Sequence, residues 1–147
     1  MDFDLNEQQH AIVHAIVQLL AQRTDPGRAV RLIDQGEYDR ELDRALADAG
    51  FYELALGEQT GLLEAVLLVE NVARAGGVVS AGASAIVVPA LLGRVPPGSV
   101  ALASAGTSEA VRFAQHARTA IVDDGEQARI VEVPPGSAEA VSNSFMT

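Results

Sequence analysis

The chain has 147 residues, of which 48% are hydrophobic and 20% are charged, so it can bury a core and is not a disordered tail. Its formal net charge of −10 argues against general nucleic-acid binding, because a negative chain repels phosphate backbones. The absence of cysteine excludes disulfides, thiolate metal sites and a cysteine nucleophile.

The first two predicted helices lie within the first 35 residues. Residues 6–23 carry apolar side chains at helical spacing, and Asn6 can cap their start. The turn sequence Asp25-Pro26-Gly27 ends this helix. A short second helix is predicted over residues 28–35. The start of the chain, MDFDLNEQQ, is acidic and polar, unlike a secretory signal, and we expect a cytoplasmic protein.

Two further amphipathic helices are predicted after Gly36. Residues 38–49 form one, with Leu42 and Leu46 on its buried side and Gly50 in the left-handed closing position. An extended apolar link is expected over residues 51–56. Thr60 can then cap a helix over residues 61–75, on which Glu70 and Arg74 stand four apart and can pair.

The fifth predicted helix, residues 79–92, is almost uncharged. It lies in a stretch of 19 residues, 75–93, that is long enough to be weighed as a membrane span. The stretch is rich in Gly, Ala and Ser, contains Pro89 and has no aromatic belt. We therefore predict a buried helix covered on almost all sides, and a membrane-associated helix pair is the weaker alternative.

After the Pro96-Pro97-Gly98 turn the pattern changes to short β-like segments. Strands are predicted at residues 100–103 and 111–113, and a hairpin at residues 118–133 that turns at Asp123-Asp124-Gly125. Three or four short strands make a poor independent core. We therefore predict an α+β chain, with an all-α bundle of about five helices at residues 1–95 and a small, incomplete antiparallel β segment at residues 96–147.

The order of these segments resembles the N-terminal part of acyl-CoA dehydrogenases. The resemblance covers roughly residues 1–93, and it is carried by three pieces whose order and spacing agree with the family: MDFDLNEQQ at residues 1–9, LADAGFYELAL at residues 46–56, and GLLEAV with VENVARAG at residues 61–66 and 69–76.

The resemblance implies a specific chemistry for the complete protein. Family members are flavoproteins that remove the α-proton of an acyl-CoA thioester and transfer the β-hydride to FAD. Their catalytic glutamate lies in a C-terminal helical domain, which lies beyond this sequence. We therefore expect no catalytic residue in this chain, and we expect FAD to be held only in the complete enzyme or complex.

The β segment departs from the family pattern. Members usually carry a Thr-Glu-Pro-x-x-Gly-Ser-Asp-like loop near flavin and substrate, and the nearest stretch here, AGTSE at residues 105–109, does not match it. The chain is similar in this respect to the reduced subunits of heteromeric acyl-CoA dehydrogenases, which are associated with the breakdown of steroid side chains. This resemblance implies a dehydrogenase-type partner subunit in a homo- or hetero-oligomer.

One group of substrate-binding residues follows from the resemblance. In the family, the helix that corresponds to residues 78–92 helps to line the acyl pocket. Small side chains there would leave a wide cavity for a bulky acyl group, although they also allow two helices to approach closely. The predicted lining residues are Ser80, Ala81, Ser84, Ala85 and Val88.

Other groupings have simpler interpretations. His10 and His14 have metal-ligand spacing but no evident third ligand, so we predict an exposed pair and no metal. The serines of the β segment lack a nucleophile turn. A solvated helix face is the prediction for the alternating charges of residues 39–48, which are Asp39, Arg40, Glu41, Asp43, Arg44 and Asp48.

The sequence is compatible with two functions from different classes. The chain is either a fragment or non-catalytic subunit of a flavin-dependent acyl-CoA dehydrogenase, or a non-enzymatic helical interaction module that kept the fold and lost the chemistry. Copurification with a yellow, FAD-containing partner favours the first, and a partner without flavin favours the second.

Overall fold

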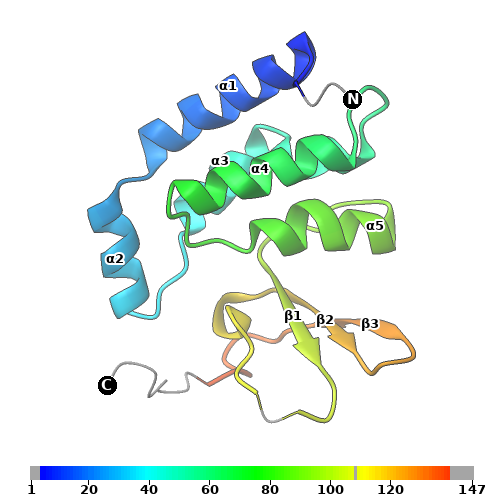
Figure 1. Cartoon of the computed structure of the whole chain (residues 1–147). Helices are drawn as coiled ribbons and strands as arrows, with labels where there is room; N and C mark the ends of the chain where they lie inside the picture. Colours follow the sequence, from blue (N-terminus) through cyan, green and yellow to red (C-terminus); the bar gives the residue numbers. More distant parts are fainter. Residues whose placement is uncertain (1–3, 108, 140–147) are drawn as a thin grey trace. The chain divides into compact units, whose positions relative to one another are not determined.

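A computed structural model describes residues 4–107 and 109–139 (Figure 1). The chain divides into two compact units, Met1–Pro96 and Pro97–Thr147. The first is helical and the second holds a small sheet, so the predicted α+β class is confirmed.

Five α-helices and two irregular helices form the first unit over its described residues, 4–96. In chain order they are α1 (Glu7–Arg23), α2 (Pro26–Asp34), α3 (Arg40–Asp48), the 3-10 helix η1 (Phe51–Leu56), α4 (Leu62–Arg74), the π-helix η2 (Ala83–Val87) and α5 (Val88–Leu92). Within this unit α4 lies between α1 and the η2–α5 helix, with α3 behind it (Figure 1).

The predicted start of α1 is confirmed in detail. The Asn6 side chain accepts a hydrogen bond from the Gln9 amide at 2.8 Å, and the Gln9 side chain accepts one from the Asn6 amide at 3.0 Å. This reciprocal pair is a capping box. At the far end of α3, Gly50 takes the predicted left-handed conformation with φ 76°.

Two predictions around residues 51–60 are wrong. The apolar link at residues 51–56 is the 3-10 helix η1 and not extended, because Gly50 turns the chain and the Glu53 amide bonds back to the Gly50 carbonyl. Thr60 does not cap α4, since its hydroxyl donates to the Leu54 carbonyl at 2.6 Å. The Glu64 carboxylate instead accepts from the Gly61 amide at the start of the helix.

The fifth predicted helix has a wide turn in its middle. Residues 83–87 form a π-helix, in which the Val88 amide bonds to the Ala83 carbonyl five residues earlier. Pro89 explains the position of this turn, because it has no amide hydrogen and its ring clashes with the carbonyl four residues before it. No helix within residues 4–107 and 109–139 is long and apolar enough to cross a membrane.

The core of the helical unit lies where α1, α3 and α4 meet. Leu42 and Leu46 of α3 are fully buried as predicted, together with Ile16 of α1 and Leu68 of α4. The predicted Glu70–Arg74 pair also forms, on the outer side of α4 with 2.6 Å between its charged atoms.

The second unit holds a three-stranded sheet in the order β1 (Val100–Ser104), β2 (Thr119–Asp123) and β3 (Ala128–Glu132). The predicted hairpin is confirmed as the antiparallel β2–β3 pair, with Asp123 and Asp124 accepting hydrogen bonds from the amides of their turn. The sheet is mixed and not antiparallel throughout, because β1 pairs parallel to β2. The connection over residues 105–118 is long enough for the crossover that parallel pairing requires.

The predicted strand at residues 111–113 does not form. These residues lie in the crossover, where Phe113 has a left-handed φ of 63° and leads into the short 3-10 helix η3 (Ala114–His116). The Arg112 guanidinium lies over the Phe113 ring, 4.7 Å from its centre. The local turn therefore forms in place of a strand, although Val111 and Phe113 have high β propensity.

Candidate functional site

The five residues predicted to line a pocket are all buried, four on one helix and one directly before it. Ser80 precedes the helix that runs through η2 into α5, and the others follow along it: Ala81, Ser84, Ala85 and Val88. This helix contacts α4 and η1. Their small side chains therefore lie within the packed helical unit, where they allow the helix to approach its neighbours closely.

Ser84 has an unusual environment among these residues. Its side chain is 1% exposed. Its Oγ is the one buried side-chain polar atom without a hydrogen-bond partner in the part of the chain that the structure describes. An unsatisfied buried hydroxyl costs about 1 to 3 kcal/mol, a cost that other contacts of the helical unit offset.

A polar network that sequence reasoning missed anchors the start of this helix. The Tyr38 and Tyr52 hydroxyls both donate to Oδ1 of Asp43, at 2.8 and 2.7 Å. Ser80 reaches the same network, because its amide donates to the Tyr38 oxygen at 3.2 Å and its Oγ lies 3.1 Å from that atom. All four residues are buried, and the network joins α3, η1 and the helix that begins at residue 81.

The electrostatics of the network keep both tyrosines protonated. Burial is the main cause that raises the pKa of Tyr38 and of Tyr52, and the nearby Asp43 charge raises both further. Each hydroxyl therefore remains a hydrogen-bond donor throughout the physiological pH range.

The prediction of a solvated charged face on α3 is wrong at two positions. Asp43 is 9% exposed and holds the tyrosine network. Asp39 is also buried, where it caps α3 and binds the Arg28 guanidinium at 2.7 Å. Glu41 and Asp48 are exposed as predicted. Asp39 and Asp43 differ from Glu41 and Asp48 because they stand at helical spacing with the buried leucines.

The Asp39 carboxylate makes part of the unit's stability dependent on pH. Burial by itself would raise the pKa of Asp39, but hydrogen bonds from Arg28 and the Leu42 amide outweigh burial and hold the pKa below its ordinary value. The stabilisation from this charge is therefore present above about pH 4 and is lost as the pH falls through the native pKa.

We expect Asp39→Asn, which keeps the helix cap and removes the charge, to destabilise the unit at pH 7 and to have progressively less effect below about pH 4. Urea unfolding of both proteins at a series of pH values measures this. A difference that is constant from pH 7 to the acid limit would contradict the role of the charge.

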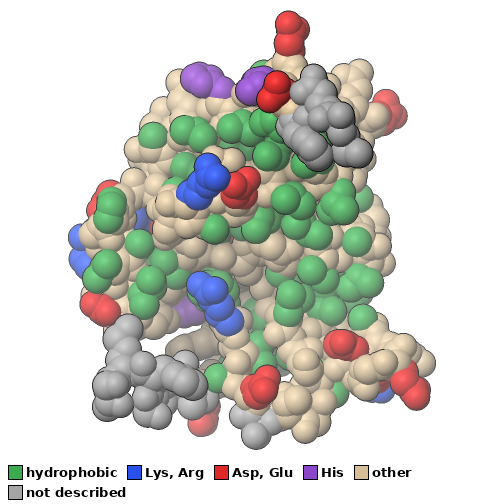
Figure 2. Space-filling model, viewed as in Figure 1, with side chains coloured by type: hydrophobic (Ala, Val, Ile, Leu, Met, Phe, Trp, Pro, Cys, Tyr) green, Lys and Arg blue, Asp and Glu red, His purple; other side chains and the backbone are tan. Residues whose placement is uncertain are grey.

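An apolar surface on α4 and the η2–α5 helix is uncovered within the helical unit. Leu62 is 59% exposed, and Leu63, Val66 and Leu91 are also exposed. Figure 2 shows hydrophobic side chains gathered over α4 and α5 on the face toward the viewer. We call Leu62, Leu63, Val66 and Leu91 the α4–α5 apolar surface. A patch of this kind is typical of a surface that another element covers.

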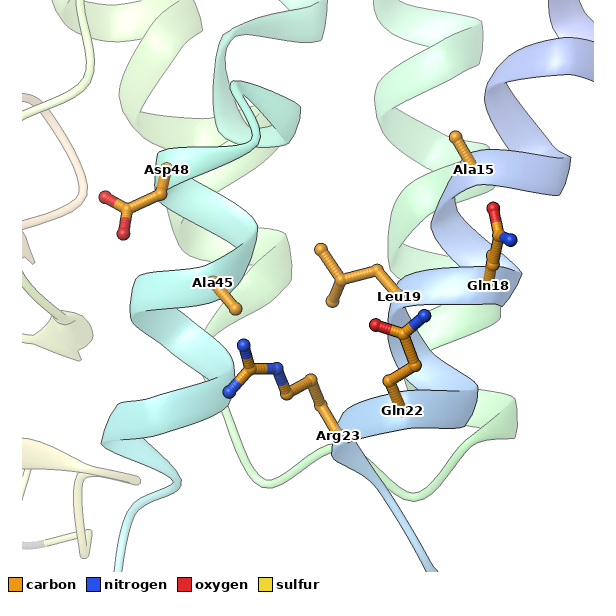
Figure 3. A pocket seen from close by; sticks show the side chains of 7 residues that line it. All are labelled: Ala15, Gln18, Leu19, Gln22, Arg23, Ala45 and Asp48. Carbon is orange, nitrogen blue, oxygen red and sulfur yellow. The ribbon is translucent and has the colours of Figure 1, made fainter.

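A groove of about 360 Å³ lies between α1 and α3 (Figure 3). Leu19 and Arg23 point from α1 toward α3, where Ala45 faces them, while Asp48 points away from Arg23. The groove therefore does not bring an acid and a base together. Its lining residues are Ala15, Gln18, Leu19, Gln22, Arg23, Ala45 and Asp48.

The remaining predicted groupings do not form a site in the described residues. His10 and His14 are exposed on α1, and residues 4–107 and 109–139 contain no group of three or more metal-ligating side chains. The Thr107 hydroxyl donates to the Ser104 carbonyl, and the Ser137 hydroxyl to the Pro134 carbonyl. The serines at positions 108, 142 and 144 lie outside the described residues.

The described residues do not fit a flavin site by themselves. A flavin ring is held by enclosed polar groups directed at it, and the one enclosed polar atom without a partner, Ser84 Oγ, belongs to the helical unit and not to the sheet. In the sheet, β3 is exposed along its whole length.

Comparison with known protein families places the helical unit in one of them. The sequence model described as "Acyl-CoA dehydrogenase, N-terminal domain" matches residues 6–94, which is more than half of the chain and lies within the first compact unit. No curated protein and no solved structure matches the chain significantly.

Proposed function

The chain belongs to the acyl-CoA dehydrogenase family, and on this basis we propose that it is a non-catalytic part of an enzyme that desaturates an acyl-CoA thioester. Family members are generally FAD-dependent. In this proposal FAD and the catalytic base are supplied by other parts of the enzyme or complex. The helical unit supplies one wall of the acyl pocket and a surface that packs against the flavin-containing part.

The observation that carries the proposal is the α4–α5 apolar surface on a family-type helical unit. Leu62, Leu63 and Val66 follow one another along α4, and Leu91 lies on α5. Burial of each large side chain by a partner would stabilise the complex by about 1.5 to 3 kcal/mol. The unit has thus formed its own core and still presents a second apolar surface for a partner of the same enzyme.

The small size of the predicted pocket residues supports a proposal about the substrate. Ala81, Ser84 and Ala85 occupy little volume beneath the helix, so the helix lies close to α4 and η1. In this proposal the helix forms one wall of the acyl pocket, so its close approach to α4 and η1 leaves more room on the pocket side. We propose that this room suits a bulky acyl group, such as a steroid side chain attached to CoA, better than a narrow straight chain.

An activity comparison tests the substrate class. The complex purified through the tagged chain is offered a straight-chain acyl-CoA and a steroid side-chain acyl-CoA with an artificial electron acceptor. We expect reduction of the acceptor with the bulky substrate at a rate at least about tenfold above the straight-chain rate. Faster turnover of the straight-chain substrate would contradict the bulky-group assignment and leave family membership intact.

The burial of all five predicted lining residues favours a second candidate function. If none of them reaches a ligand, the helical unit serves as an interaction module without a share in catalysis. The same purification separates the two functions. A partner that contains no flavin and turns over no acyl-CoA supports the interaction module, and a flavin-containing partner with desaturase activity supports the first proposal.

A further inference from the structure

The two tyrosines of the chain bind Asp43 in the same way but differ in their contact with Ser80. Each donates one hydrogen bond to the same carboxyl oxygen, and each is buried to the same degree. Tyr38 additionally accepts from the Ser80 amide and contacts the Ser80 hydroxyl. Tyr52 makes no hydrogen bond to Ser80 within the described part of the chain.

The contact with Ser80 fixes the start of the helix that runs from residue 81 to Leu92. The Asp39 amide also donates to the Val78 carbonyl at 3.0 Å, so residues 78 and 80 are both tied to the start of α3. Hydrogen bonds are directional and set the position and rotation of a helix more sharply than apolar contacts do.

The rest of this helix has few features that would fix its register. It carries no charged side chain, and along its first turns the buried side chains are small, as at Ala81, Ala83 and Ala85, with the larger Val88 buried further along. The π-turn at η2 widens the helix in its middle, and within the described residues the Ser84 hydroxyl makes no hydrogen bond. The hydrogen bonds between Ser80 and Tyr38 therefore contribute strongly to the position of the helix.

We propose that Tyr38, held by Asp43, is the positioning residue for the acyl-pocket helix and so sets the acyl-group selectivity of the enzyme. This inference rests on the proposed function, because the helix lines the pocket only in that proposal. Tyr38 acts through Ser80 and touches no reacting atom. Tyr52 donates to the same Asp43 oxygen without a hydrogen bond to Ser80, so it is the natural control.

The test compares Tyr38→Phe with Tyr52→Phe, since each removes one buried hydroxyl from the same Asp43 oxygen and keeps the ring. Amide hydrogen exchange is measured by mass spectrometry on the whole chain. In Tyr38→Phe we expect exchange over residues 80–88 to become about three- to tenfold faster relative to α1 and α4. In Tyr52→Phe the same ratio should stay within about twofold. Equal changes in both variants would overturn the anchoring role.

Selectivity is then measured in the flavin-containing complex. Tyr38→Phe should change the ratio of kcat/KM for the steroid side-chain and straight-chain acyl-CoA by about threefold or more, with unchanged FAD content, while Tyr52→Phe leaves the ratio unchanged. Equal ratios in all three proteins would overturn the selectivity role. If the unaltered chain yields no flavin and no turnover, the proposed function fails, and the exchange comparison still decides whether Tyr38 anchors the helix.

Discussion

Replacing Asp43 by alanine is expected to lower the free energy of unfolding of the helical unit by about 2 to 5 kcal/mol. The substitution removes the acceptor of two buried tyrosine hydroxyls, at 2.8 and 2.7 Å, and each unsatisfied hydroxyl costs about 1 to 3 kcal/mol. Urea unfolding followed by far-ultraviolet circular dichroism measures the change.

The matched control for Asp43→Ala is Asp48→Ala on the same helix. Asp48 is exposed near the C-terminal end of α3, where the helix dipole disfavours a negative charge. We therefore expect this variant to unfold within about 0.5 kcal/mol of the unaltered chain. If Asp43→Ala also stays within that range, the tyrosine network does not stabilise the unit and the account given for α3 is wrong.

The second large effect is expected at Leu68, which is fully buried on the inner side of α4. Leu68→Ala should cost about 2 to 5 kcal/mol, because it removes apolar contacts and leaves a cavity in the core. Leu62→Ala on the outer side of the same helix should cost less than about 1 kcal/mol in the isolated chain.

The comparison of Leu68 and Leu62 separates folding from partner binding. If the α4–α5 apolar surface is a docking surface, Leu62→Ala weakens association with the partner although it leaves the unit folded. A loss of stability at Leu62 equal to that at Leu68 would mean that both sides of α4 are covered within the chain, and it would contradict the uncovered surface.

Much of the helical unit was predictable because its signals are local. The capping box at Asn6, the apolar spacing of Leu42 and Leu46, and the left-handed Gly50 each depend on residues within one or two helical turns. The hairpin turn at Asp123 and Asp124 is local in the same sense, since its side chains bind amides two or three residues ahead.

The errors arose where distant residues decide the outcome. The burial of Asp43 depends on hydroxyls supplied from residues 38 and 52, so the alternating charges of α3 looked fully solvated. A signal was nevertheless present, because Asp39 and Asp43 stand at helical spacing with Leu42 and Leu46 and both tyrosines of the chain lie nearby. The parallel pairing of β1 likewise depends on the course of a long connection and not on strand composition.

The candidate site could be predicted only in part. Sequence resemblance located the helix at residues 78–92, but it did not show that Ser84 and its neighbours are enclosed or that Ser80 is anchored by Tyr38. Pro89 argues against a membrane span, but the spacing of residues does not reveal its effect on the preceding turn. These features come from packing between segments, which spacing along one helix does not reveal.

The most direct test of the account is whether the chain joins a flavin-containing partner through the α4–α5 apolar surface. The tagged chain is purified from its native cells, and bound FAD is measured for the unaltered chain, for Leu62→Asp, and for Val30→Asp, which alters a residue of similar exposure on α2. We predict a yellow complex with the unaltered chain and with Val30→Asp, and loss of most of the FAD with Leu62→Asp. Equal FAD content in all three proteins, or none in any, would contradict the account.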